Sequence, residues 1–154
     1  MILKSANKLL LLNREKPSAI GLRNGVGGKI EPGETIEDLV CREVFEQTGY
    51  EIVAPIYKGD IILHGEQQVG IHLFLAELSD DLKYDEVMKT REGILEWKEI
   101  EWVLHPDNIG IISNLKRYLQ PMLESRVPMQ HVFHYSGHDL LAYSYKQMDE
   151  TAFI

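Results

Sequence analysis

Apolar and polar positions divide the chain into short β-strands and two helices. Three pairs of largely apolar segments are each joined by a short polar turn. Such pairs predict β-hairpins, here over residues 1–4 and 8–13, 51–63 and 68–78, and 132–135 and 140–145. Residues 94–103 predict a further strand followed by a bend, and residues 79–90 predict a charged loop.

The clearest helix is predicted over residues 36–48. Thr35, with Asp38 three positions later, has the form of a capping box, and Gly49 stands where a helix-ending glycine is expected. A second helix is predicted over residues 111–123, where apolar residues recur with helical spacing and leave a polar face. Together these elements predict one α+β domain that covers residues 1–154.

Composition narrows the functional class. With 154 residues, 44% of them hydrophobic, the chain is long enough for one domain with a substantial core. The formal net charge of -8 argues against binding to nucleic acid polymers or to anionic membranes. Cys41 is the only cysteine, so an internal disulfide is excluded, and no apolar run approaches the roughly 20 residues of a membrane span. We therefore expect a soluble cytoplasmic protein.

The predicted helix over residues 36–48 changes from apolar to acidic along one side. At about 100° per residue, apolar residues in its first half and polar residues in its second half are predicted on the same side, namely Ile36, Leu39 and Val40 and then Glu43, Glu46 and Gln47. Acids near a helix C-terminus also oppose the helix dipole. A divalent cation would make this cluster favourable, and oxygen ligands favour Mg²⁺ or Mn²⁺ over zinc. The alternative is a solvated acidic patch.

The segment from Gly28 to Tyr50 resembles the Nudix box. In that motif a glycine is followed, after five residues, by a glutamate. After seven more residues comes a run that begins with Arg-Glu and ends in glycine and a bulky apolar residue. This chain has Gly28, Glu34 and the run from Arg42 to Tyr50. Gln47 departs from the motif, because the family usually has glutamate there. The resemblance implies the Nudix fold, a mixed β-sheet sandwiched between helices (an α/β/α sandwich), and a hydrolase of phosphoric anhydrides. It also implies an ion pair between Arg42 and Glu34 that braces the loop against the helix, the alternative being an exposed pair of little consequence.

The same resemblance implies a metal site that binds Mg²⁺, with Mn²⁺ as a substitute. The Gly28 carbonyl and Glu46 would bind the cation, and Gln47 would be a weak or absent ligand. Glu43 would be either a further ligand or the general base that deprotonates water. Glu92, just before a predicted strand, would complete the site, the alternative being an ordinary loop acid.

Two other stretches resemble the MutT-like triphosphatases that remove oxidised purine nucleotides. Around Asn24 the chain resembles the strand in which an asparagine reads the purine edge, so Asn24, Gly27 and Lys29 would contact the substrate. The alternative for Asn24 is a residue that caps a turn. Further on, His-Pro-Asp-Asn stands where the animal enzymes have Trp-Pro-Asp-Asp, which would place Asp107 and Asn108 near the base, with a simple turn as the alternative.

Histidines and tryptophans outside the box are expected to have structural roles. Alternation along the last predicted hairpin places His131, His134 and His138 on a sheet surface rather than around a zinc ion. Trp97 and Trp102 are expected to be core or sheet aromatics rather than platforms for a base.

The reaction that these resemblances imply is metal-dependent hydrolysis of a purine nucleoside triphosphate, such as 8-oxo-dGTP, to the monophosphate and pyrophosphate. The expected partner is a small-molecule nucleotide, and the expected state is a monomer or a homodimer. One alternative is a Nudix hydrolase of ADP-ribose, nucleotide sugars or dinucleoside polyphosphates. The other is a non-catalytic nucleotide-binding domain in which Gln47 marks lost activity; the otherwise intact box favours an enzyme.

Overall fold

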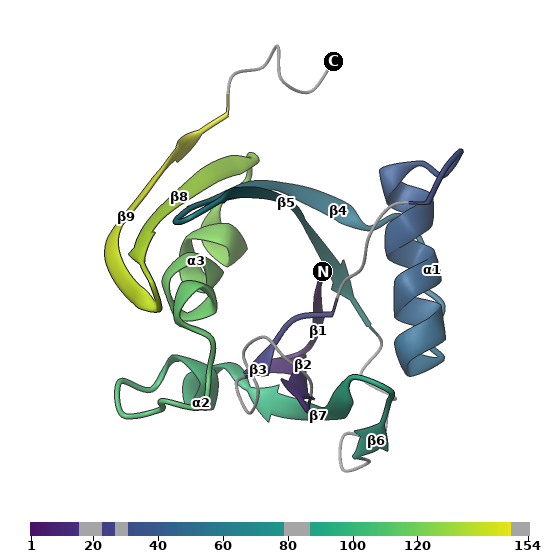
Figure 1. The fold of residues 1–154 in the computed structure, drawn as a ribbon. Coiled ribbons are helices and arrows are strands. Elements are labelled where there is room, and N and C mark those ends of the chain that lie inside the picture. The colour runs from purple at the N-terminus through teal and green to yellow at the C-terminus, as the bar shows by residue number, and fades with distance from the viewer. Residues whose placement is uncertain (16–22, 27–30, 79–86, 149–154) are drawn as a thin grey trace. The chain divides into compact units, whose positions relative to one another are not determined.

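The computed structural model describes residues 1–15, 23–26, 31–78 and 87–148 (Figure 1). The described residues within Met1–Ile56 and Leu75–Ile112 form one compact unit, and those within Tyr57–Phe74 and Ser113–Ile154 form a second. Strand β5 (Gln68–Glu77) continues from the second unit into the first, and the expectation of one domain stays a prediction. Within the described residues, no helix is both long and apolar enough for a membrane span.

The first unit is built on a mixed β-sheet. Besides the end of β5, its strands are β1 (Ile2–Ser5), β2 (Lys8–Arg14), β3 (Arg23–Asn24), β6 (Met88–Lys89) and β7 (Gly93–Glu99). Antiparallel pairs join β1, β3 and β7 to β2 and join β6 to β7, whereas β1 and β5 run parallel. The predicted first hairpin is confirmed, with Leu3 opposite Leu10. Both faces of β2 are buried, which explains its unbroken run of leucines.

Helix α1 (Ile36–Thr48) confirms the helix predicted at the box. The Thr35 hydroxyl accepts a hydrogen bond from the Asp38 N–H at 3.1 Å and so caps the first turn. Gly49, with φ of 78°, ends the helix in the left-handed conformation that glycine adopts without strain. The buried side chains of α1 are Val40 and Val44. The two caps therefore fix where the box helix begins and ends.

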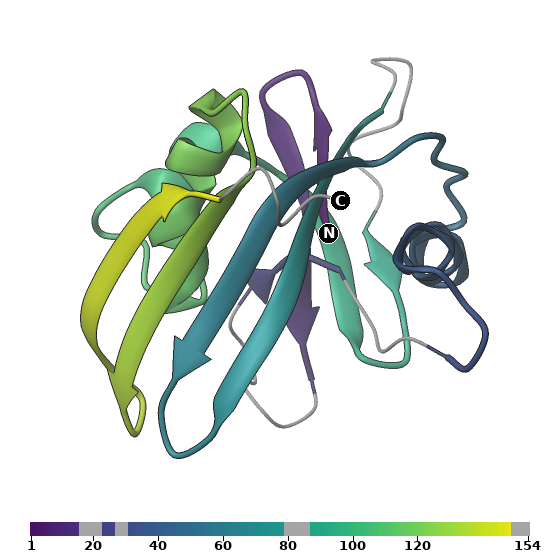
Figure 2. The same cartoon turned by 90° about the horizontal axis from the view of Figure 1, so that it is seen from above.

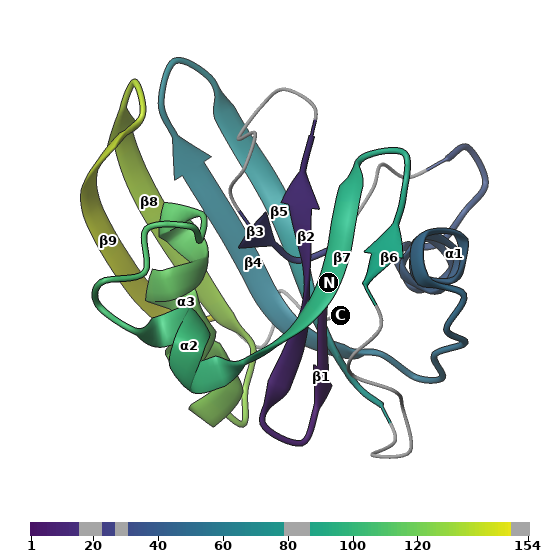
Figure 3. The same cartoon turned by 90° about the horizontal axis from the view of Figure 1, so that it is seen from below.

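The strand and bend predicted over residues 94–103 are strand β7 and a short helix, α2 (Ile100–Leu104). Figure 3 shows β7 leading directly into α2. Val103 is fully buried, whereas Trp102 on the same helix is 38% exposed. The expectation of a core aromatic is therefore right for Trp97, which is 6% exposed, and wrong for Trp102.

The second unit is a sheet with strand order β5-β4-β8-β9. Its other elements are β4 (Ile56–His64), β8 (Met129–Ser136), β9 (Asp139–Gln147) and helix α3 (Ser113–Glu124). Strands β4 and β8 are parallel, and β8 and β9 form the predicted final hairpin (Figure 2). β4 begins five residues later than predicted, because Ala54 has a φ of 52° and Pro55 follows it, so the chain turns there.

Helix α3 packs on β8 and buries a residue that we expected on a surface. The ring of Tyr118 on α3 lies 5.8 Å from that of His131 and 6.5 Å from that of Phe133. His131 is fully buried, so the prediction of a surface position is wrong for it and right for His134, which is exposed. Alternation places the two histidines on opposite faces of β8, and only one of those faces is covered by α3.

Candidate active site

Arg42 ties the loop before α1 to the helix. Its Nε and Nη2 atoms donate to the two carboxylate oxygens of Glu34 at 2.6 and 3.0 Å, which is the expected ion pair in bidentate form. Glu34 also accepts a hydrogen bond from the Glu31 N–H at 3.3 Å. The hydrogen bond from Arg42 lowers the pKa of the Glu34 carboxyl group, and the same contact raises the pKa of the guanidinium. Both groups are therefore charged at neutral pH.

The remaining nitrogen of the same guanidinium brings two box glutamates together. Arg42 Nη1 donates to Glu43 Oε1 at 3.1 Å and to Glu46 Oε2 at 3.2 Å. Because one nitrogen bonds both carboxylates, they converge on one point. The Glu43 side chain is 18% exposed and that of Glu46 is 56% exposed. The prediction that both lie on the buried side is thus wrong for Glu46. Three residues turn the helix by about 300°, so Glu46 lies about 60° around the helix from Glu43, toward solvent.

Gln47 occupies the position where the box departs from its family. Its Nε2 donates to Glu43 Oε2 at 3.0 Å, and its Oε1 is buried. Both oxygens of Glu43 therefore accept hydrogen bonds, one from Arg42 and one from Gln47. This contact between Gln47 and Glu43 is not among the sequence-based predictions, although the spacing of four residues on a helix indicates it.

The chemistry of Glu43 and Glu46 fits a divalent cation. Carboxylate oxygens are the ligands that Mg²⁺ and Mn²⁺ prefer, and these two already converge on a cationic group, the guanidinium of Arg42. In the part of the chain that the structure describes, no group of three or more His, Cys, Asp or Glu side chains is placed to hold a metal. Gly28, whose carbonyl is another expected ligand, lies outside the described residues.

Glu92 lies between β6 and β7, at the turn where the sequence placed it. Its carboxylate lies 3.7 Å from Nη1 of Arg14 at the end of β2, and its carbonyl accepts the Glu15 N–H at 2.8 Å. The Glu92 side chain is 43% exposed. Its role as a metal ligand stays a prediction.

Asn24 has the contact expected of a residue that caps a turn. Its Oδ1 accepts a hydrogen bond from the Gly25 N–H at 2.8 Å. Gly25 is required there, because a Cβ at this position would lie 2.5 Å from the Met1 carbonyl oxygen. Contact between Asn24 and a base stays a prediction, and the other two expected substrate contacts in this stretch, Gly27 and Lys29, lie outside the described residues.

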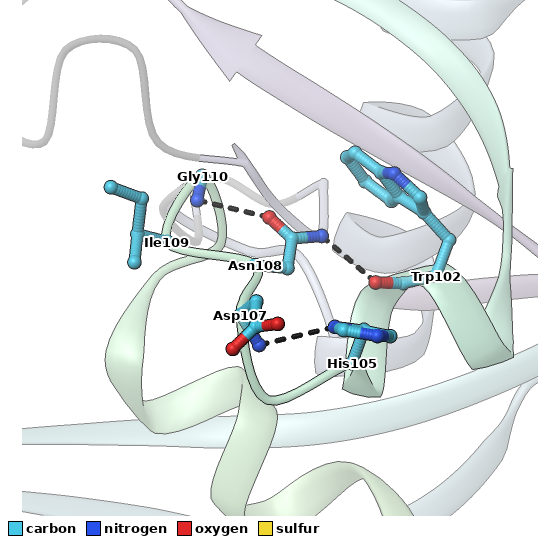
Figure 4. A pocket seen from close by; sticks show the side chains of 6 residues that line it. All are labelled: Trp102, His105, Asp107, Asn108, Ile109 and Gly110. Carbon is cyan, nitrogen blue, oxygen red and sulfur yellow. Dashed lines mark hydrogen bonds between the residues drawn. The ribbon is translucent and has the colours of Figure 1, made fainter.

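The loop after α2 forms an open hollow of about 470 Å³ (Figure 4), lined by Trp102, His105, Asp107, Asn108, Ile109 and Gly110. Asn108 braces this loop, since its Nδ2 donates to the Trp102 carbonyl at 2.8 Å and its Oδ1 accepts from the Gly110 N–H at 3.0 Å. The Asp107 N–H donates to His105 Nδ1 at 3.1 Å. These contacts are those of the turn alternative, and base recognition by Asp107 and Asn108 stays a prediction.

Trp102 is a candidate site residue that sequence reasoning assigned to the core. Its ring lines the hollow, and the ammonium of Lys98 lies 4.9 Å from the ring centroid. Helical spacing could not have indicated its exposure, because Lys98 lies on the strand and Trp102 on the short helix.

Known proteins resemble this chain in sequence and in fold. A family model described as the NUDIX domain matches residues 1–124. YvcI, an uncharacterized Nudix hydrolase of Bacillus subtilis (strain 168), is 34% identical over 102 residues, which are 64% of this chain and 63% of YvcI, so less than two thirds of that relative is matched. The oxidized purine nucleoside triphosphate hydrolase of Mus musculus is 25% identical over 150 residues, 92% of this chain and 88% of that protein. The crystal structure of the MutT protein from Bacillus halodurans has a TM-score of 0.72 at 26% identity, with 94% of each chain covered.

Proposed function

This chain belongs to the Nudix family, and from that premise we propose that it is a metal-dependent hydrolase of nucleotide phosphoanhydrides that converts a purine nucleoside triphosphate to the monophosphate and pyrophosphate. Family and fold class are those that the box indicated. The observation that carries the proposal is the convergence of Glu43 and Glu46 on Arg42 Nη1, with the rest of that guanidinium held by Glu34.

The chain's own residues would supply positioning and charge. Glu43 and Glu46 would hold Mg²⁺, and when bound the cation would neutralise phosphate charge and lower the pKa of an attacking water. Glu34 holds the guanidinium of Arg42 in place through two hydrogen bonds, so the loop and the helix keep one relative position. Glu43, the less exposed of the two acids, is the one that could also accept the proton of water.

A purine triphosphate is the substrate class that the relatives favour. One relative that spans most of the chain is named as an oxidized purine nucleoside triphosphate hydrolase, and a solved structure that spans 94% of the chain is a MutT protein. The hollow beside Trp102 and Asp107 offers an aromatic ring and a carboxylate, which together could stack on a purine and accept a hydrogen bond from its edge. The most specific part of the proposal is that the purine is oxidised, and the name of the Mus musculus relative supports it.

The test is turnover at saturating Mg²⁺ on 8-oxo-dGTP, dGTP, dATP, CTP, ADP-ribose and a sugar nucleotide, with pyrophosphate measured separately from phosphate. We expect pyrophosphate from one purine triphosphate, and a loss of at least about 100-fold in Glu46→Gln, because a catalytic carboxylate is removed. Activity on ADP-ribose or the sugar nucleotide alone would support hydrolysis of a phosphoanhydride but would reject a triphosphate as the substrate. Nucleotide binding without turnover at any Mg²⁺ concentration would indicate a binding domain.

A further inference from the structure

We infer that Gln47 is a positioning residue for Glu43, and that it acts through its amide N–H rather than as a metal ligand. The inference rests on the proposed function for its catalytic consequence. Its structural part rests on the 3.0 Å hydrogen bond from Gln47 Nε2 to Glu43 Oε2. Glu43 is thereby held from both sides, since its other oxygen accepts from Arg42 at 3.1 Å.

Chemistry fixes which end of the Gln47 amide faces Glu43. A carboxylate only accepts hydrogen bonds, so an amide beside it must present its NH₂ group and not its carbonyl oxygen. In this orientation the carbonyl oxygen of Gln47 is buried. The atom through which an amide would bind a cation is therefore turned away from Glu43.

Charge explains why an amide suits this arrangement. Within 3.6 Å of its nitrogens, the guanidinium of Arg42 meets the carboxylates of Glu31, Glu34, Glu43 and Glu46. A glutamate at position 47 would add a fifth carboxylate and would face Glu43 acceptor to acceptor. The glutamine replaces that repulsion with a donor, so Glu43 is held in one place before any cation binds.

The chain supplies a matched control for this pair. Gln120 Nε2 donates to Glu124 Oε1 at 2.8 Å, also over four residues of a helix, but both side chains are exposed on α3. Loss of a glutamine that merely supports a helix surface should have similar small effects in both pairs. Loss of a glutamine that positions a largely buried carboxylate should have a larger effect at Gln47 alone.

The first experiment is a double-mutant cycle in urea, with EDTA present so that no metal contributes. Gln47→Met, Glu43→Met and the double variant are compared with Gln120→Met, Glu124→Met and their double variant. We expect a coupling of about tenfold in the unfolding equilibrium for the first pair, as for a hydrogen bond to a charged group, and about twofold for the exposed pair. Equal couplings in the two pairs would overturn the inference.

The second experiment separates positioning from metal binding. Mn²⁺ alone is titrated by electron paramagnetic resonance into the wild-type protein, Gln47→Met, Glu43→Met and the double variant, and kcat and KM of wild type and Gln47→Met are measured on the triphosphate that turns over. Because Gln47 acts only through Glu43, we expect the double variant to bind Mn²⁺ within about twofold of Glu43→Met, and we expect kcat of Gln47→Met to fall about tenfold with KM within about twofold of wild type. A double variant that binds Mn²⁺ tenfold or more weakly than Glu43→Met would make Gln47 a ligand and overturn the inference.

Failure of the proposed function would have a different signature. If the wild-type protein hydrolyses none of the nucleotides, the proposed function fails, while the urea cycle and the Mn²⁺ titration still decide whether Gln47 holds Glu43. Gln47→Glu gives a further check on charge: we expect lower stability than wild type in EDTA and a larger gain in stability on adding Mn²⁺, whereas a smaller gain than wild type would overturn the inference.

Discussion

At the scale of single residues, Arg42 connects the parts of the candidate site. Its three nitrogens reach Glu34, Glu43 and Glu46, so one side chain both braces the loop and neutralises the acids that a cation would join. The box motif predicted the contact with Glu34. Helical spacing could have predicted the contact with Glu46, which lies four residues on. It could not have predicted the contact with Glu43, because neighbouring residues on a helix do not usually face each other.

Replacing Arg42 with lysine should therefore lower both activity and stability, although the positive charge is kept. A lysine ammonium is a point charge that cannot bond both oxygens of Glu34 and still reach Glu43. For Arg42→Lys we expect kcat/KM on the best triphosphate to fall about 10- to 100-fold, together with a lower melting temperature. Arg117→Lys, on the exposed side of α3, is the control and should match wild type; equal activity in both variants would contradict the bracing role.

At the scale of elements, the hairpins and α1 were predictable because their signals are local. The caps at Thr35 and Gly49 and the short polar turns are written in consecutive residues. Features that depend on what lies above a strand were not predictable. The Tyr118 ring of α3 packs on the face of β8 that carries His131, which is buried, and the bend after β7 becomes a helix.

The N-terminal cap of α1 should stabilise the helix that carries Glu43 and Glu46. Thr35→Ala removes the acceptor of the Asp38 N–H, and we expect the free energy of unfolding to fall by about 1 kcal/mol. Thr35→Ser keeps the hydroxyl and should lose much less. Urea denaturation of the three proteins checks this, and an alanine variant as stable as the serine variant would show that the cap contributes nothing.

At the scale of the whole molecule, stability should depend on pH through His131. Burial lowers the pKa of His131 to about 4 from an ordinary value of 6.5. Its Nδ1 contacts the Tyr143 hydroxyl at 2.8 Å, and within the described residues its buried Nε2 has no hydrogen-bond partner. The folded protein therefore keeps the ring neutral while the unfolded chain takes up a proton. The stability that this contributes is complete above pH 6.5 and is lost as the pH falls from 6.5 toward 4.

A variant that cannot titrate should lose this part of the pH dependence. We expect His131→Phe to have a shallower fall in unfolding free energy between pH 7 and pH 5 than wild type, measured by urea denaturation at several pH values. His134→Phe, at an exposed position of the same strand, should keep the wild-type slope. Equal slopes in wild type and His131→Phe would mean that His131 is not held neutral by burial.

The negative net charge of the protein should make turnover of a triphosphate depend on a bound cation. The protein carries a formal charge of -8, so a triphosphate would meet both a repulsive surface and the acids of α1 unless a cation lies between them. The most direct measurement is the rate of pyrophosphate release from the best triphosphate as free Mg²⁺ rises from zero, in wild type and in Glu46→Gln. We predict no turnover in EDTA, a saturable rise in wild type, and a rate at least about 100-fold lower in the variant. Turnover that persists in EDTA, or equal curves for the two proteins, would contradict the assignment of α1 as the catalytic helix.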